Sequence, residues 1–376
     1  MMTAPRGTMA DHTLELSVVV PTFNERGNLG ELLRRLDLSL QGIAWEVIVV
    51  DDDSPDQTAA LARQLAQQDR RVRCLQRVGR RGLASACIEG MLASAAPYLA
   101  VMDADMQHDE TRLAEMLRLL RSGGTDIVVG SRYVVGGDEG ARDRTRASMT
   151  AAASRLSRLV CRQDVSDPMS GFFMLPRQTL EKVVRRLSGV GFKILLDILA
   201  SSPSPLCVRE VPYTFRDRFA GESKLDTGSI WEYGMLLADK LFGGYVPVRF
   251  LSFILVGSAG VVVHMAVLTA LLKGVGVPFP ASQTWATIVA ILFNFSVNNV
   301  LTYRDMRLRG RRWLRGLATF MLACGIGAVA NVGVSSYLFD QRTGWILAGL
   351  AGIAVGAAWN YVVTLEYTWR RVARSR

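Results

Sequence analysis

Four long apolar stretches in the second part of this 376-residue chain constrain its fold more than any other feature. A helix needs about 20 apolar residues to cross the hydrocarbon core of a bilayer. The stretches cover approximately residues 250–272, 281–301, 317–338 and 344–365, and the first contains a single ionisable residue, His264. Because four such stretches in succession are not typical of a soluble core, we expect residues 249–376 to form an all-α membrane domain of four transmembrane helices.

Arginines between and after these stretches predict their orientation. Six arginines lie within residues 303–317 and four more within 370–376, whereas the two other short connections contain only Lys273 and Arg342. Lys and Arg in short loops stay on the cytoplasmic side, so we expect the N-terminal domain and the C-terminal tail to be cytoplasmic. The formal net charge of +10 then favours a lipid bilayer with anionic head groups. The sequence shows no basic stripe interleaved with aromatic residues, the pattern that would indicate a nucleic-acid partner.

The chain's first residues and its cysteines carry weaker signals. Residues 1–15 lack the apolar segment of a signal peptide and are expected to be a disordered lead. The five cysteines form no CxxC pair and no metal-ligand spacing with the three histidines. This usage is typical of reduced thiols in a cytosolic compartment.

Short apolar runs alternate with helical periodicity over residues 16–225. Strands are predicted at 16–20, 45–50, 72–76, 98–102 and 126–129, and helices at 28–40, 58–68, 82–95 and 111–121. This alternation predicts an α/β, Rossmann-like domain with a mostly parallel sheet and helices on both faces. Residues 226–248 are amphipathic and lead into the first apolar stretch, so we expect an interfacial helix or linker there.

Polar residues directly follow four of these strands. In open α/β sheets, ligands bind outside the carboxyl ends of the strands. The sequence therefore predicts a catalytic site at this edge, built from the clusters Thr22–Glu25, Asp51–Asp56, Asp103–Gln107 and Ser131–Arg132.

Asp103 and Asp105 form a pair of carboxylates after the predicted strand 98–102, and Gln107 follows them. Two neighbouring carboxylates repel each other unless a cation neutralises them, and hard divalent cations prefer oxygen ligands. We therefore predict a Mg²⁺ or Mn²⁺ site completed by a substrate diphosphate. A solvated acidic turn or a helix N-cap is the alternative.

Other clusters leave two interpretations open. Asp51 and Asp52 could accept hydrogen bonds from a nucleoside, whereas Ser54 and Asp56 suit helix capping. Arginine binds phosphates through a bidentate fork, but the same residues could form a solvated surface charge. The basic residues to which this choice applies are Arg132, Arg142, Arg144, Arg146, Arg218 and Lys224, together with Ser148 near the first group.

Taken as an ordered set, the motifs resemble those of a known family. They are Pro21–Glu25, Asp51–Asp56, Asp103–His108, Gly130–Tyr133, Ser170–Phe172, Glu210–Phe215 and Ser223–Leu225. Over residues 16–245 the chain resembles the dolichol and polyprenol phosphate mannose synthases, which are inverting family 2 glycosyltransferases with a GT-A fold. Its C-terminal part resembles the small four-span GtrA-type membrane domains. Asp53 and Gln57 stand where related sequences commonly have glycine.

This resemblance implies GDP-mannose as donor and a dolichyl or polyprenyl monophosphate as acceptor. It implies that Asp105 and Arg132 are catalytic and that Asp103, Asp105 and Gln107 hold the metal. Arg132, Arg144 and Ser148 match acceptor-phosphate contacts. The implied nucleotide-sugar contacts are Pro21, Phe23, Glu25, Val50, Asp52, Asp103, Ala104, Met106, Lys193, Arg218 and Lys224.

The implied reaction is a single displacement with inversion at the cytoplasmic membrane face. A phosphate whose second pKa is about 6 is largely ionised at neutral pH, so the acceptor needs no strong general base. Two alternatives stay open: a polyprenyl phosphate glucosyltransferase that uses UDP-glucose, and a flippase for a lipid-linked sugar. We favour an anchoring role for the spans over flipping.

Overall fold

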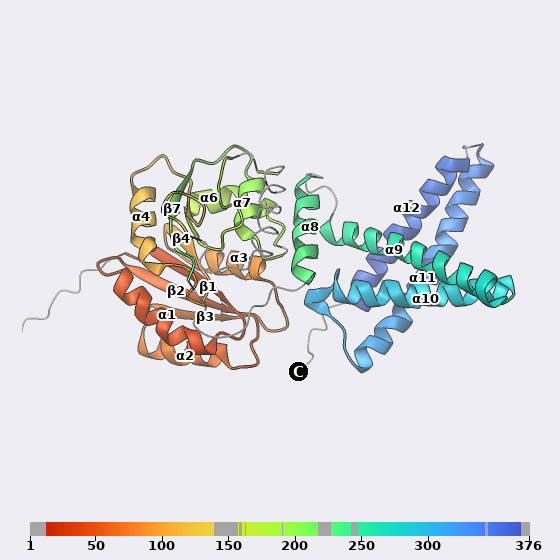
Figure 1. The fold of residues 1–376 in the computed structure, drawn as a ribbon, viewed down its shortest axis with the longest axis horizontal. Helices are drawn as coiled ribbons and strands as arrows, with labels where there is room; N and C mark the ends of the chain where they lie inside the picture. The colour runs from red at the N-terminus through yellow and green to blue at the C-terminus, as the bar shows by residue number, and fades with distance from the viewer. Residues whose placement is uncertain are drawn as a thin grey trace, which may run out of the picture. The chain divides into compact units, whose positions relative to one another are not determined.

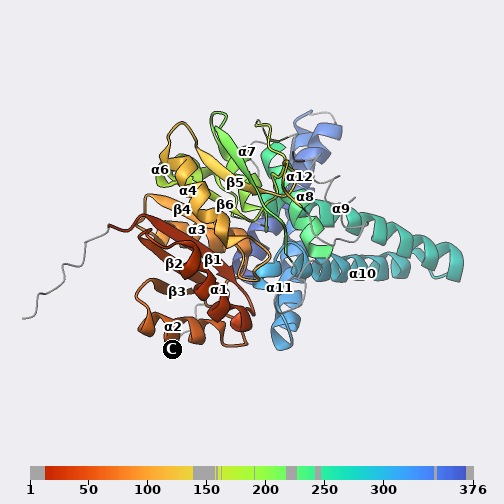
Figure 2. The same ribbon diagram turned by 60° about the vertical axis from the view of Figure 1, so that its left-hand side comes forward.

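The computed structural model describes most of the chain and divides into two compact units, residues 1–244 and 245–376. Figures 1 and 2 show the path of the chain in two views. The described residues are 13–138, 157, 160–161, 163–189, 191–216, 227–241, 247–342 and 345–369.

The first unit is built on one seven-stranded sheet with the order β3-β2-β1-β4-β6-β5-β7. Among the described strands, only β6 runs antiparallel to its neighbours, β4 and β5; the other pairs are parallel. The predicted α/β class with a mostly parallel sheet is therefore confirmed. The strands are β1 (Leu16–Thr22), β2 (Trp45–Asp51), β3 (Val72–Gln76), β4 (Tyr98–Val101), β5 (Ile127–Ser131), β6 (Phe173–Pro176) and β7 (Val208–Pro212).

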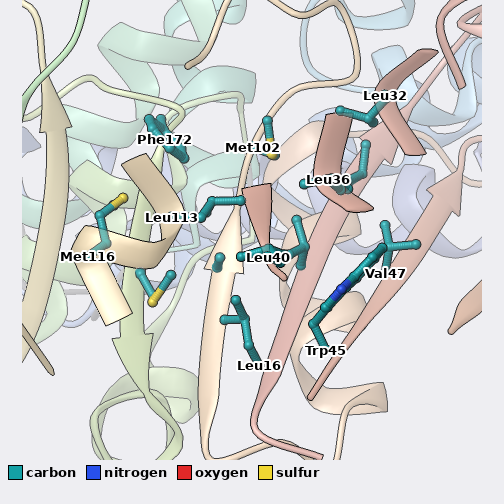
Figure 3. Close-up of a cluster of buried hydrophobic side chains, with 14 of the residues drawn as sticks. Leu16, Leu32, Leu36, Leu40, Trp45, Val47, Met102, Leu113, Met116 and Phe172 are labelled. Carbon is teal, nitrogen blue, oxygen red and sulfur yellow. The ribbon is translucent and has the colours of Figure 1, made fainter. Parts of the chain in front are cut away.

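Helices cover both faces of the sheet because successive strand side chains point to opposite sides. In β1, Val18 and Val20 join one buried cluster, whereas Val19 joins the other. Figure 3 shows the first cluster, in which Leu32 and Leu36 of α1 lie on the same side of the sheet as Met116 of α4. The first face carries α1 (Arg26–Ser39), α2 (Thr58–Gln68) and α4 (Leu113–Arg121), and the second carries α3 (Leu83–Ala93), α6 (Arg177–Val183) and α7 (Ile194–Ser201).

Helix α8 (Thr227–Leu241) closes the described part of the first unit. Its Tyr233 and Leu236 are buried against Leu196 of α7 and Met169. At least part of its apolar face thus packs on the body of the first unit. That the segment also lies in a membrane interface stays a prediction.

The described part of the second unit is helical. Two segments, 249–275 and 311–338, are long and apolar enough to cross a membrane, with mean hydropathies of 2.2 and 1.9. That the other two apolar stretches also cross stays a prediction. The long helices are α9 (Val248–Thr269, continued by a π-helical turn Ala270–Val275), α10 (Phe279–Val300), α11 (Arg311–Asp340) and α12 (Trp345–Val363, continued by Thr364–Thr368).

These helices form two antiparallel hairpins that repeat the same contacts. In the first, a Cβ added to Gly260 would lie 2.1 Å from Asn294 Oδ1; in the second, a Cβ on Gly327 would lie 2.1 Å from Asn360 Oδ1. Hydroxyl pairs recur at the same register, Ser252 with Thr302 at 2.6 Å and Thr319 with Thr368 at 3.1 Å.

The hairpins also exchange equivalent aromatic contacts. Phe253 lies 5.9 Å from Tyr361, and the equivalent pair Phe320 and Phe295 lies at 5.5 Å. Tyr303 and Trp369, which end the two hairpins, stack at 4.0 Å. Each hairpin therefore meets the other through the same face, as in a two-fold symmetric dimer.

We expect Gly260→Val and Gly327→Val to destabilise the membrane unit to a similar degree. Each added side chain would run into the asparagine of the facing helix, and overpacking a close contact costs about 1–3 kcal/mol. Thermal unfolding of the purified protein in detergent measures this. Gly257→Val is the matched control, because no heavy atom lies within 4 Å of an added Cβ there. Unequal effects of the two variants would contradict the equivalence of the hairpins.

Candidate active site

The predicted polar clusters meet at one edge of the sheet. β1, β2, β4, β5 and β7 all run in the same direction, so their carboxyl ends share this edge. β6 runs the opposite way, which brings the Ser170–Phe172 segment before it to the same edge. The structure thus gathers residues that lie up to about 190 positions apart, from Thr22 to Pro212.

Asp51 organises the turn after β2 and has both oxygens engaged within the protein. Its Oδ1 accepts hydrogen bonds from Ser54 Oγ at 2.5 Å and Thr22 Oγ1 at 3.2 Å, and Oδ2 accepts from the Ser54 amide at 2.9 Å. The N-cap of α2 is Gln57, and Asp56, one residue earlier, accepts from the Thr58 amide of the first turn at 3.0 Å. Asp51 and Asp52 were both candidates for a nucleoside contact. Asp51 instead stabilises the turn after β2.

Two residues in this turn have the left-handed backbone conformation that favours glycine. Asp53 has a φ of 56° and Gln57 a φ of 67°. These are the two positions at which the family resemblance leads us to expect glycine. The chain therefore keeps the glycine-type turn despite the side chains, and Asp53 is among the residue types that tolerate this conformation best.

Asp52 joins the turn to the segment before α3. Its Oδ1 accepts from Arg77 Nη1 at 2.7 Å and its Oδ2 from the Gly82 amide at 2.7 Å. Burial raises the pKa of Asp52, although the Gly82 amide and Arg77 act in the opposite direction. Nearby, the Arg81 guanidinium lies 4.3 Å above the ring of Phe23.

The other predicted nucleoside contacts differ in what they can offer. The side chain of Val50 is fully buried in the core, so only its backbone could meet a ligand. Ala104 and Met106 are likewise buried, at 2% exposure each. Glu25 is buried and accepts from Asn28 Nδ2 at 2.6 Å. Pro21 lies half-buried within β1.

Asp103 and Asp105 follow β4, and a buried histidine supports their loop. The Asp103 amide donates to His108 Nδ1 at 3.1 Å, and His108 stacks on Phe172 at 5.3 Å. Burial lowers the pKa of His108 to about 4. The imidazole is therefore neutral at physiological pH, and the bond from the Asp103 amide assigns its single proton to Nε2.

The two carboxylates differ in exposure, and their chemistry fits a divalent cation. The Asp103 side chain is 38% exposed, whereas residue Asp105 is 5% exposed and accepts from the Gln107 amide at 3.1 Å. Gln107 Nε2 donates to the Arg216 carbonyl at 3.2 Å, which orients the side-chain amide next to Asp105. Among the described residues, no three acidic, His or Cys side chains form a complete metal site. Two carboxylates that share the ion with substrate oxygens are a ligand set that Mg²⁺ commonly takes.

Arg132 is buried and held by a residue that the sequence did not single out. Its Nε and Nη2 donate to the two carboxylate oxygens of Asp167 at 2.7 and 2.9 Å. Burial opposes the charge of Arg132, but the hydrogen bonds of Asp167 outweigh this and raise the pKa of Arg132. The bidentate bond fixes the guanidinium plane and leaves Nη1 as the amino group not bonded to Asp167.

Glu210 of β7 in turn fixes the segment that carries Asp167. Its Oε1 accepts from Ser166 Oγ at 2.6 Å and from the Asp167 amide at 3.3 Å, and its Oε2 accepts from the Ser166 amide at 3.1 Å. Ser166 Oγ also pairs with Ser131 Oγ at 2.7 Å. The end of β5 is therefore tied to β7 through this segment.

Lys193 lies at the start of α7, and its Nζ donates to the Met169 carbonyl at 3.1 Å. The segment 166–172 thus contacts Lys193 on one side and Arg132 on the other. The remaining predicted contacts, Arg144, Ser148, Arg218 and Lys224, lie outside the described residues.

Both parts of the chain match known protein families in sequence. Residues 17–184 match the profile of glycosyl transferase family 2, and residues 252–369 match that of the GtrA/DPMS transmembrane domain. A dolichol-phosphate mannosyltransferase of Pyrococcus furiosus is 36% identical over 359 residues, which cover 95% of this chain and 99% of that protein. The chain belongs to the dolichol-phosphate mannosyltransferase family. It is thus a membrane protein with a glycosyltransferase domain.

Other relatives of this family match a smaller part of the chain. The dolichol-phosphate mannosyltransferase of Saccharomyces cerevisiae is 34% identical and aligns with 64% of this chain and 93% of its own length. Among solved structures, a complex of Mycobacterium tuberculosis glucosyl-3-phosphoglycerate synthase with Mn²⁺, UDP-glucose and phosphoglyceric acid is 19% identical. The match covers 60% of this chain and 79% of the synthase chain, with a TM-score of 0.45.

For this mannosyltransferase-family chain, sequence reasoning missed Asp167 and Arg77, and it named His108 and Glu210 only within motifs, without a role. Asp167, Arg77 and His108 bond to predicted site residues, and Glu210 bonds to Asp167. Asp167 lies three residues before Ser170-Gly171-Phe172, a motif of the resemblance. That proximity was the available signal for it.

Proposed function

We propose that this family member transfers mannose from GDP-mannose to a dolichyl or polyprenyl monophosphate, with inversion, at the cytoplasmic membrane face. The supporting observation is the shared strand edge, which gathers two carboxylates and a buried, rigidly held arginine. Such a site offers oxygen ligands for a metal-bound diphosphate and a directional donor for a second phosphate. Membership of the family supports mannose as the transferred sugar.

On the donor side, Asp103, Asp105 and the Gln107 oxygen would hold a Mg²⁺ or Mn²⁺ ion. When bound, the ion supplies Lewis-acid stabilisation of the leaving diphosphate. The protein's own contribution is to orient these ligands: His108 accepts from the Asp103 amide and Asp105 accepts from that of Gln107. Lys193, with Arg218 and Lys224, would contact the nucleotide diphosphate.

On the acceptor side, Arg132 would orient the lipid phosphate through Nη1. Because Asp167 compensates its charge, Arg132 contributes a fixed hydrogen-bond direction more than net attraction. An ionised phosphate oxygen can attack the anomeric carbon directly, so no side chain has to remove a proton. Arg144 and Ser148 would complete the acceptor contacts.

We propose that the second unit anchors the enzyme through four spans and does not flip the product. The yeast dolichol-phosphate mannosyltransferase aligns with 64% of this chain, so the remaining 36% has no counterpart in that alignment. This supports transfer chemistry that does not depend on the membrane unit. The arginines of the 303–317 connection support a cytoplasmic orientation.

A donor panel tests the proposal. The purified protein is incubated with a polyprenyl phosphate, Mg²⁺ or Mn²⁺, and GDP-mannose, UDP-glucose or UDP-mannose, and the lipid product is separated and its anomeric configuration determined. We expect transfer from GDP-mannose and an inverted, β-linked product. Transfer from UDP-glucose alone would establish the glucosyltransferase alternative instead.

A further inference from the structure

A buried ion pair joins α8 to the body of the catalytic domain. Lys240, in the last turn of α8, places its Nζ 2.6 Å from Asp197 Oδ1 on α7. The Lys240 side chain is 8% exposed and that of Asp197 is fully buried. The ammonium also lies within hydrogen-bonding distance of Ser201 Oγ at 2.9 Å and the Arg186 carbonyl at 3.3 Å, so each of its three protons has an acceptor.

The second oxygen of Asp197 holds the segment that leads to Lys193. Asp197 Oδ2 accepts from the Ser188 amide at 2.9 Å, Ser188 Oγ at 2.8 Å and the Gly189 amide at 3.3 Å. The backbone amide of Asp197 donates to the Lys193 carbonyl at 3.1 Å, which is the ordinary bond of the first turn of α7. The Asp197 side chain thus holds Ser188 and Gly189 at the start of the 188–193 segment, and Lys240 holds that side chain through its other oxygen.

The attachment of α8 does not by itself require this charge pair. Tyr233 and Leu236 already bury apolar surface against Leu196 and Met169. A buried ion pair is often no more stabilising than well-packed apolar residues of similar volume, because burial removes both charges from water. A pair with every polar atom satisfied is better suited to fixing a position than to adding stability.

We infer that Asp197 and Lys240 are positioning residues of the donor site. They hold the 188–193 segment so that Lys193 Nζ lies where the diphosphate of the nucleotide sugar binds. The inference deepens the proposed function and rests on it through the role of Lys193. It also gives α8 a second task, because the helix that leads to the membrane unit sets the geometry of the donor site.

The test uses the full-length protein and variants that separate stability from positioning. Asp197→Leu/Lys240→Met removes both charges of the pair, whereas Asp239, whose Oδ2 lies 3.3 Å from Lys240 Nζ, is kept. We expect it to lower the melting temperature by several degrees, because Ser188 and Gly189 lose their acceptor, and to raise the donor KM and the GDP Kd about tenfold, the effect of losing one charge-assisted hydrogen bond. The acceptor KM should change less than threefold. Lys182→Met, an exposed lysine on α6, is the matched control.

A second arm asks whether the effect passes through Lys193. Lys193→Met should raise the donor KM at least as much, and the double variant should add little in that background, because residues acting as one unit are not additive. Fully additive effects, or a wild-type donor KM in a well-folded double variant, would overturn the inference. Should the double variant not fold, Asp197→Asn with GDP binding by calorimetry decides the same question.

The two proposals fail in different ways. Absence of GDP binding and of transfer from GDP-mannose by the wild-type protein would reject the proposed donor. The positioning comparison can then be made with whichever nucleotide diphosphate sugar the donor panel identifies, since Lys193 would contact the diphosphate common to all of them. A normal wild-type reaction with an unaltered double variant rejects the inference alone.

Discussion

Replacing Asp105 with alanine is expected to lower kcat by about a thousandfold, because Lewis-acid stabilisation by a metal contributes several kcal/mol and each 1.36 kcal/mol is a factor of ten. Asp105 is 5% exposed and accepts from the Gln107 amide, so its loss removes one proposed metal ligand and loosens a second. Initial rates measured over a range of Mg²⁺ and Mn²⁺ concentrations check this. The variant should require far more metal for any residual activity.

Two comparisons make that result specific. Glu115→Ala removes a partly exposed carboxylate on α4, outside the site, and should leave the rate unchanged. EDTA should abolish transfer by the wild-type protein, with recovery on adding excess Mg²⁺ or Mn²⁺. Activity that survives both EDTA and Asp105→Ala would show that the carboxylate pair serves another purpose, such as a solvated acidic turn.

Much of the sheet could be predicted because its strands are buried on both faces. β1, β2 and β4 read as continuous apolar runs, and α2 was placed at its observed bounds, Thr58–Gln68. β6 and β7 were not predicted. β6 has four residues, Phe173–Pro176, and Arg209 and Glu210 interrupt the apolar pattern of the edge strand β7. Neither segment has a hydrophobic pattern long enough to identify it as a strand.

The residues at strand ends could be predicted, and their supports could not. Strand-end position follows from local pattern, which located Asp103, Asp105 and Arg132. Asp167 and Glu210 make contacts between positions 35 to 44 residues apart in the sequence. Lys240 of α8 contacts Asp197 of α7. Such pairs depend on how elements pack, which no periodicity encodes. The pairing of the two hairpins was missed for the same reason.

Replacing Asp167 with alanine is expected to destabilise the catalytic domain by about 3–5 kcal/mol, because it leaves the charge of Arg132 buried without its partner. Arg132 is 7% exposed at its side chain and Asp167 is fully buried, so water cannot easily take over the lost bonds. In whatever fraction stays folded, the guanidinium loses its fixed plane. Misplacing a group by about 1 Å can lower catalysis about a hundredfold, which should appear in kcat/KM for the lipid phosphate.

Denaturant unfolding and acceptor titrations distinguish these two effects. Asp164→Ala is the matched control, since Asp164 lies exposed three residues earlier in the same segment and its loss should change stability by no more than about 0.5 kcal/mol. Glu210→Gln preserves the shape of the support but weakens its bonds to Ser166 and the Asp167 amide, so it should reduce acceptor use with a smaller loss of stability. If Asp167→Ala matched the control in stability, Arg132 would have found another partner, and the bidentate pair would not be what orients the acceptor phosphate.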